Sequence, residues 1–162
     1  MTTEGRPVSS SRVEMTHLPL PYEANLLGTV HGGVIMRLVD EAGAVAAVRH
    51  AKRQCVTAAI DSMTFLAPAK VGSLLILKAS VNLAGTTSLE AGVRVEMEDL
   101  LTGRRLHISS AYIVYVALGD DGKPCGVPPL IPETDEDRRR MAEAALRRQQ
   151  RRQRKGGVST EP

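Results

Sequence analysis

A glycine-rich turn at the start of a long helix is the part of this sequence best suited to chemistry. Residues 28–33 read Gly-Thr-Val-His-Gly-Gly and lead into a nearly apolar run, residues 34–52, which predicts a buried helix. Backbone N–H groups at such a helix start carry partial positive charge and can stabilise a developing oxyanion. The amides of Gly32 and Gly33 are therefore candidates for activating a bound carbonyl in acyl transfer, although a Gly-Gly helix start also serves plain chain reversal.

Asp40 is the second candidate, and helix geometry places it roughly 10 Å beyond Gly33 along the same axis. That distance is too long for the Asp40 carboxylate to act on a carbonyl held at its own helix start. If two copies pair with antiparallel central helices, Asp40 of one copy approaches the glycine turn of the other, and two equivalent sites result. The alternative is that Arg37 neutralises Asp40 and Glu41 at helical spacings of three and four. For Glu41 we favour this ion pair, and for Asp40 both interpretations stay open.

The segments around this helix have the period of β-strands. Alternating apolar and polar residues predict strands at residues 12–17, 54–66, 73–84, 88–99 and 106–118. The links between the last four are short and contain Gly or Pro, so the neighbouring strands must be antiparallel. We expect an α+β fold in which a curved antiparallel sheet of about five to six strands wraps around one long central helix. The free edge of so long a sheet favours edge-to-edge dimers.

The length of 162 residues and the hydrophobic content of 43% predict one globular domain with tails. We expect a flexible N-terminus over residues 1–10, the domain over 11–132, a C-terminal helix over 133–155 and a disordered tail over 156–162. Residues 138–155 hold eight Arg and one Lys against one Glu, so this segment carries +8 and the remaining chain −5 of the net +3. The segment has no interleaved aromatic residues and only a thin apolar stripe, which predicts a solvated, weakly packed helix and no nucleic-acid partner.

Targeting and metal signals are missing from the sequence. The first twelve residues lack the apolar core of a secretory signal, and no run reaches membrane-spanning length, so a cytoplasmic location is expected. Cys55 and Cys125 lie far apart without metal-ligand spacing, which favours free thiols. No metal site is predicted.

The stretch from Asn25 to Ala44 resembles the signature of hotdog-fold acyl-CoA thioesterases, in particular the cytosolic acyl-CoA hydrolase and YciA-like branch. Further matching motifs follow in order and spacing at residues 63–68, 71–72, 85–88, 101–103 and 127–130. The last of these precedes the arginine-rich helix, and together the matches cover roughly residues 10–150.

This resemblance implies hydrolysis of acyl-CoA thioesters to free fatty acid and CoA, in homodimers that group into hexamers as trimers of dimers. It also implies that Asn25, otherwise a turn residue, and Asp40 are catalytic residues supplied by different subunits. Asp40 would then act on water as a general base, in preference to attacking the thioester itself. His31 belongs to the turn motif, and we expect it to position the turn. No cofactor is expected, because CoA is part of the substrate.

The resemblance also suggests residues that bind the CoA part of the substrate. Thr86, Thr87 and Ser88 border the pantetheine arm by this comparison, and Phe65 belongs to the matching motif at residues 63–68. Lys70 and the arginines of the tail are cations that can meet the phosphates, although ordinary exposed cations are the simpler interpretation.

Two other functions stay open at this stage. A hotdog dehydratase or hydratase would use His31 together with an acid on acyl thioesters. A non-catalytic acyl-CoA-binding module would use the basic helix to contact a partner.

Overall fold

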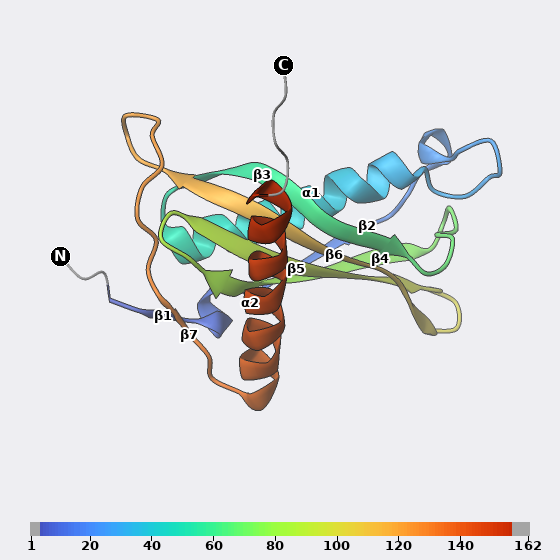
Figure 1. Cartoon of the computed structure of the whole chain (residues 1–162). Helices are drawn as coiled ribbons and strands as arrows, with labels where there is room; N and C mark the ends of the chain where they lie inside the picture. The colour runs from blue at the N-terminus through green and yellow to red at the C-terminus, as the bar shows by residue number, and fades with distance from the viewer. Residues whose placement is uncertain (1–3, 157–162) are drawn as a thin grey trace, which may run out of the picture.

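A five-stranded antiparallel sheet with one long helix on each face forms most of the protein (Figure 1). The computed structural model describes residues 4–156. The strands are β2 (Val13–His17), β3 (Gln54–Phe65), β4 (Leu74–Ala84), β5 (Ser88–Glu98) and β6 (Arg105–Leu118). Their order in the sheet is β2-β4-β5-β6-β3. The predicted α+β fold is confirmed, with five strands in the main sheet.

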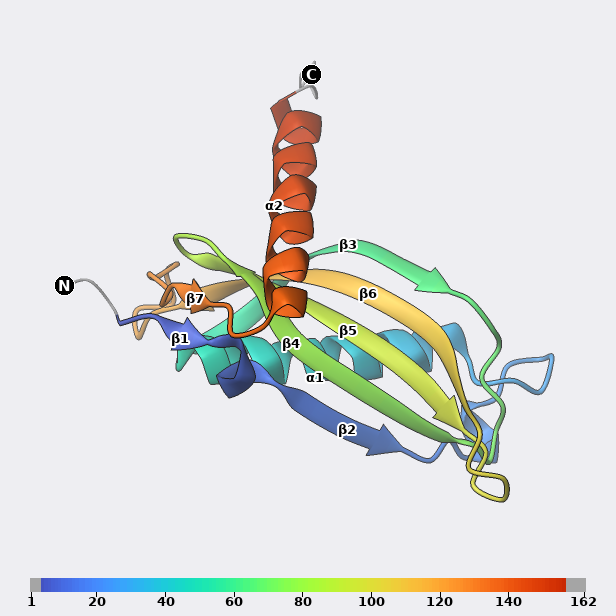
Figure 2. The ribbon, with the colours of Figure 1, turned by 90° about the horizontal axis from the view of Figure 1, so that it is seen from below.

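The central helix α1 (Gly32–Ala51) lies along one face of the sheet (Figure 2). The middle of its contact face is made of small side chains, because Ala42, Ala46 and Ala47 are fully buried there. Larger aliphatic residues of the sheet, such as Leu77 and Ile113, fill the space opposite and are also fully buried. Small residues on the helix let the curved sheet approach it closely, and this contact forms the core.

Strand β3 is an edge of the sheet and exposes apolar side chains along its length. Val56, Ile60 and Phe65 are 47%, 43% and 51% exposed, and Met36 and Val48 of the neighbouring α1 are exposed to a similar degree. A free edge of twelve residues flanked by apolar side chains is the kind of surface that pairs with another strand.

The N-terminal segment differs from the flexible stretch expected over residues 1–10. Strand β1 (Arg6–Pro7) pairs in parallel with β7 (Leu130–Ile131), and a 3-10 helix covers Val8–Ser11. Val8 is 3% exposed, so burial of one apolar side chain and a parallel pair hold this segment to the domain. The sequence did not reveal this pair of strands, because a strand of two residues is too short to show an alternating pattern of apolar and polar residues. Residues 157–162 of the predicted disordered tail lie outside the described residues.

Helix α2 (Asp135–Gly156) crosses the face of the sheet opposite α1. Its start has a capping-box pattern, in which the Asp137 N–H donates to Thr134 Oγ1 and the Thr134 N–H donates to Asp137 Oδ2. A second 3-10 helix, Pro21–Glu23, precedes the glycine turn. No helix within residues 4–156 combines the length and the apolar character needed to cross a bilayer.

Candidate active site

The carboxylate of Asp40 is held by two hydroxyl groups from the sheet. Thr57 Oγ1 donates to Asp40 Oδ1 at 2.7 Å, and the Tyr115 hydroxyl contacts both the Asp40 carbonyl oxygen at 2.9 Å and Oδ1 at 3.2 Å. Burial, together with the neighbouring Asp40 carboxylate, raises the pKa of Tyr115, so its hydroxyl stays protonated and acts as a donor. Asp40 Oδ2 has no hydrogen-bond partner among residues 4–156.

The alternative in which Arg37 neutralises Asp40 is not found. Arg37 pairs with Glu41 at 2.7 Å, the pair that the sequence favoured, and its other acidic contact is Glu23 at 3.9 Å. Within the described chain Asp40 has no ion-pair partner at all. The carboxylate is therefore oriented without being paired with a cation.

Gly43 explains how Tyr115 reaches Asp40. A Cβ atom at position 43 would overlap the Tyr115 hydroxyl, so only glycine leaves room for this side chain beside the helix. Sequence reasoning missed both Tyr115 and Thr57 as site residues. The available signal was a tyrosine among the aliphatic residues of a strand, in a chain with only four aromatic side chains.

The glycine turn has one occupied and one free amide. His31 is the N-cap of α1, and its Nδ1 accepts a hydrogen bond from the Gly33 N–H at 2.9 Å, while the Val34 N–H donates to the His31 carbonyl oxygen. The Gly33 amide, expected to bind an oxyanion, is thus already taken in this structure. The Gly32 N–H has no acceptor within residues 4–156. Gly32 also lines a hollow of about 330 Å³ together with Phe65 and Pro68.

Asn25 organises the loop in front of this turn. Its Oδ1 accepts hydrogen bonds from the backbone N–H groups of Leu27 and Thr29, and its Nδ2 donates to Thr29 Oγ1 at 3.0 Å. The interpretation of Asn25 as a turn residue is therefore correct for a single chain. An amide nitrogen carries two N–H groups, so one donor is left for a ligand.

The predicted site residues form two groups at opposite ends of the sheet. Thr57 of β3 pairs with Tyr115 of β6, and Tyr115 pairs with Leu89 of β5. The turn that holds Thr86, Thr87 and Ser88 comes just before Leu89, so it belongs to the Asp40 end. Phe65 ends β3 beside Gly32, and Lys70 is bridged to Thr29, so these residues belong to the glycine-turn end.

The two groups are too far apart to work together within one chain. Gly32 and Asp40 are eight residues apart on α1, which corresponds to roughly 12 Å along the helix axis. One chain therefore does not bring Asn25 and Gly32 to Asp40.

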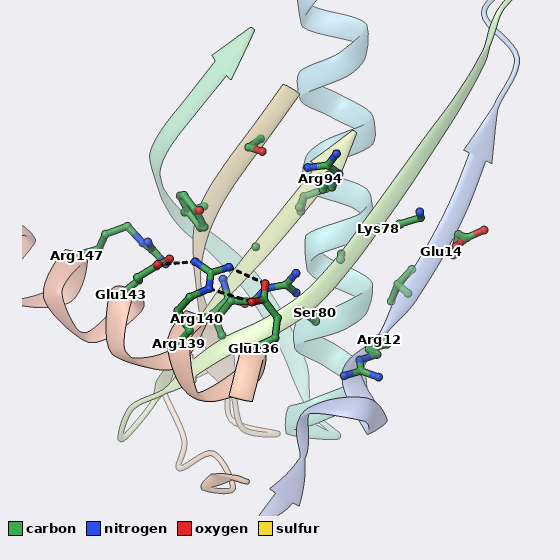
Figure 3. Close-up of a pocket in the computed structure, with 17 residues that line it drawn as sticks. Arg12, Glu14, Lys78, Ser80, Arg94, Glu136, Arg139, Arg140, Glu143 and Arg147 are labelled. Carbon is green, nitrogen blue, oxygen red and sulfur yellow. Dashed lines mark hydrogen bonds and ion pairs between the residues drawn. The ribbon is translucent and has the colours of Figure 1, made fainter. Parts of the chain in front are cut away.

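A larger hollow, about 620 Å³, lies elsewhere, between α2 and the outer face of the sheet (Figure 3). It contains none of the predicted site residues. Each of its cationic side chains is paired with an acid, namely Arg12, Lys78, Arg94, Arg139, Arg140 and Arg147. Among residues 4–156, no three His, Cys, Asp or Glu side chains gather in a group that could hold a metal ion.

Comparison with known proteins identifies relatives along the chain. The family model of the Thioesterase superfamily matches residues 27–103. The uncharacterized acyl-CoA thioester hydrolase YkhA of Bacillus subtilis (strain 168) is 37% identical over 136 residues, which cover 84% of this chain and 79% of that protein. The cytosolic acyl coenzyme A thioester hydrolase of Rattus norvegicus is 34% identical over the whole chain, which spans only 43% of that longer protein. A crystal structure of an apo-hexameric acyl-CoA thioesterase superposes with a TM-score of 0.92 at 39% identity, covering 96% of this chain and 99% of that one.

Proposed function

This chain belongs to the Thioesterase superfamily, and from that membership and its site we propose that it hydrolyses acyl-CoA thioesters to free fatty acid and CoA. The observation that carries the proposal is the state of Asp40. Its carboxylate is oriented by Thr57 and Tyr115, is paired with no cation of the described chain, and keeps one oxygen free. Such a carboxylate is suited to accept a proton from an attacking water.

In the proposed reaction, Asp40 Oδ2 takes a proton from a water molecule while the water oxygen attacks the thioester carbonyl carbon. The Gly32 N–H and the remaining Asn25 Nδ2 donor stabilise the oxyanion that forms, and they do so more strongly than they bind the ground-state carbonyl. The carbon–sulfur bond then breaks, the proton held by Asp40 passes to the sulfur, and CoA leaves as the free thiol. Direct attack by Asp40 as a nucleophile is the less favoured variant of this scheme.

A homodimer is the proposed unit of activity, because neither end of the sheet holds a whole site. Antiparallel pairing of two β3 edges about a two-fold axis near the middle of the strand aligns opposite ends of the two copies. Asp40 and Thr57 of one subunit then lie near the partner subunit's Gly32. The similarity to a hexameric thioesterase supports further assembly of the dimers into hexamers. We also propose a cytoplasmic location, which the names of the cytosolic relatives support.

The structure limits the dehydratase alternative, which needs the His31 ring as an acid or base. Nδ1 of that ring accepts the Gly33 N–H, so only Nε2 is left for proton transfer. A non-catalytic acyl-CoA-binding module stays as an outcome of the experiment below.

The decisive test is release of free thiol from a panel of acyl-CoA chain lengths. We expect turnover by the wild type and a loss of roughly a hundredfold or more in Asp40→Asn, because the general base is removed. Glu41→Gln is the matched control, since Glu41 is the neighbouring acid and forms a surface ion pair with Arg37. Tight binding of acyl-CoA without thiol release at any chain length would support the binding module and overturn hydrolysis.

A further inference from the structure

We infer that the arginines of the last turns of α2 form a binding site for the clustered phosphates of a nucleotide, and that the nucleotide is the CoA part of the substrate. This inference rests on the proposed function. The site is a groove between α2, the β4–β5 turn and the middle of β3, with a volume of about 400 Å³, and we call it the arginine groove. Its cationic rim consists of Arg148, Arg152 and Arg154, and the apolar part of its floor of Ala58, Ala59, Leu83 and Val114. Asp61 and Glu90 also line the groove, and both are paired with Arg151.

The three rim arginines differ from the other arginines of α2 in lacking acid partners. Five arginines of the helix are paired with carboxylates, namely Arg138, Arg139, Arg140, Arg147 and Arg151. Arg148, Arg152 and Arg154 have no ion-pair partner among residues 4–156. Three unpaired guanidinium groups on one groove create a local positive potential that attracts an anion of several charges.

Arg148 is the most informative member of the rim, because it is half-buried and still unpaired. Its guanidinium lies over Gly85 of the β4–β5 turn, where a Cβ atom would come within 2.9 Å of Nη2. Glycine at this position thus makes room for the side chain. Partial burial of a charge without a partner is unfavourable, so its position is better explained if an anion completes the site.

The neighbouring Arg151 holds the rim in place. It donates to Asp61 of β3 at 2.9 Å and to Glu90 of β5 at 2.9 Å, which anchors the last turns of α2 to two strands. Arg148 and Arg152 are therefore presented by a fixed helix and not by a free tail. The planar fork of each guanidinium matches the geometry of phosphate oxygens.

The groove also lies at the correct end of the protein for this substrate. Ala58 and Ala59 of its floor follow Thr57, whose hydroxyl donates to Asp40, by one and two residues along β3. In a CoA thioester the pantetheine arm separates the reacting carbonyl from the phosphates, so the phosphates must bind outside the catalytic centre. The arginine groove therefore lies at the same end of the sheet as Asp40, on the face that α2 covers.

The larger hollow on the outer face of the sheet is a weaker candidate for the same ligand. Each cation in that hollow already forms an ion pair with an acid of the chain, so an anion would have to displace existing ion pairs. The arginine groove offers charges that need no such exchange.

The test compares two triple variants with the same change of charge on the same helix. The first, Arg148→Gln with Arg152→Gln and Arg154→Gln, removes the rim of the groove. The second, Arg138→Gln with Arg139→Gln and Arg140→Gln, removes three paired arginines outside it. Steady-state kinetics are measured with an acyl-CoA and with the same acyl group on pantetheine, which has no phosphate.

We expect the first variant to raise KM for the acyl-CoA about tenfold or more, since it loses several charge-assisted hydrogen bonds. The KM for the acyl-pantetheine should be the same in this variant and in the wild type, and the control variant should match the wild type with both substrates. Equal KM values for acyl-CoA in all three proteins would overturn the assignment to CoA.

A calorimetric titration separates the sources of phosphate and the two proposals. Desulfo-CoA and ADP are titrated into the wild type and both variants, which requires no turnover. If desulfo-CoA binds to the wild type and the control but not to the first variant, the groove is supported even if no acyl-CoA is hydrolysed. The proposed hydrolysis can therefore be wrong while the binding site is right. Binding of ADP with an unchanged KM for acyl-CoA assigns the groove to a free nucleotide instead, and no binding of either probe overturns the site.

Discussion

Hydroxyl groups, and not cations, surround the carboxylate of Asp40. Thr57 and Tyr115 both donate to Oδ1, and Gly43 supplies the space that Tyr115 needs. Neutral donors fix the direction of a carboxylate without forming an ion pair that a substrate would have to break. The nearest arginine in the helix, Arg37, is occupied by Glu41. At the scale of residues, the site therefore keeps one acid oriented and available.

His50 gives a prediction about stability at this scale. It is fully buried, donates from Nε2 to the Pro128 carbonyl oxygen at 2.9 Å, and leaves Nδ1 without a partner in the described chain. Burial, opposed by the Pro128 hydrogen bond and aided by the charge of Arg6, lowers its pKa below 6.5. Between the lowered folded value and 6.5 the unfolded chain binds more protons, so the free energy of unfolding falls as pH is lowered through this window.

The measurement is urea unfolding between pH 7.5 and pH 5 at fixed protein concentration. We expect the wild type to lose stability at no more than about 1.4 kcal/mol per pH unit from this one group. His50→Gln keeps a donor for Pro128 and should lose less over the same range. The carboxyl of Glu23, whose pKa is lowered by the Leu20 N–H and by His17, contributes only near and below 4.5. Parallel pH profiles for the two proteins would contradict the assignment to His50.

At the scale of elements, α2 is attached more firmly than its sequence indicates. The thin apolar stripe predicts weak packing, and Ala144 is the one side chain of that stripe which is fully buried among the described residues. The attachment comes from Glu90 of β5, which is 2% exposed and accepts from Arg147 at 2.7 Å and from Arg151 at 2.9 Å. Arg147 also lies 3.6 Å from the centre of the Tyr112 ring. Buried ion pairs and a cation–π contact thus replace apolar burial.

Removal of the shared acid should therefore be costly. We expect Glu90→Gln to lower the free energy of unfolding by about 3 kcal/mol or more, because Arg147 loses its carboxylate partner and Arg151 loses one of two. Glu143→Gln is the control, since it breaks an exposed pair with Arg139 and should change stability by less than about 1 kcal/mol. Urea unfolding measures both. Equal effects would show that the buried pair does not anchor the helix.

At the scale of the whole molecule, the two halves of the proposed site lie at opposite ends of one sheet. The arrangement predicts that each site takes Asn25 and Gly32 from one subunit and Asp40 and Thr57 from the other. A two-fold dimer has two such sites. If one subunit carries a substitution of Asn25 and the other a substitution of Asp40, both substitutions fall in one site and the second site is intact.

This leads to a complementation experiment. Asn25→Ala and Asp40→Asn subunits, each inactive as homodimers, are co-expressed with different tags and the heterodimers are purified. We expect about half of the wild-type turnover per dimer, because one of the two sites contains neither change. Heterodimers without activity, although folded and paired, would mean that each site is formed within one subunit.

Local patterns along the chain were sufficient for much of this architecture. The strands predicted at residues 54–66, 73–84 and 88–99 begin or end within one residue of β3, β4 and β5, and the buried helix is α1. Periods of two and of 3.6 residues and the glycines between them depend on neighbours in sequence, which is why they could be found without coordinates. The distance between Gly33 and Asp40 could also be found from the sequence, because it follows from the rise per residue of a helix.

Contacts between distant residues were decided only by the tertiary structure. Thr57 and Tyr115 lie 17 and 75 positions from Asp40, and they meet it because β3 and β6 pair in one register, with a shift in register just after Thr57. The occupied Gly33 amide depends on the rotamer of His31, and the anchored α2 depends on burial of Glu90. Register, rotamer and burial are properties of the packed chain, and a sequence pattern that is periodic over a few residues carries no information on them.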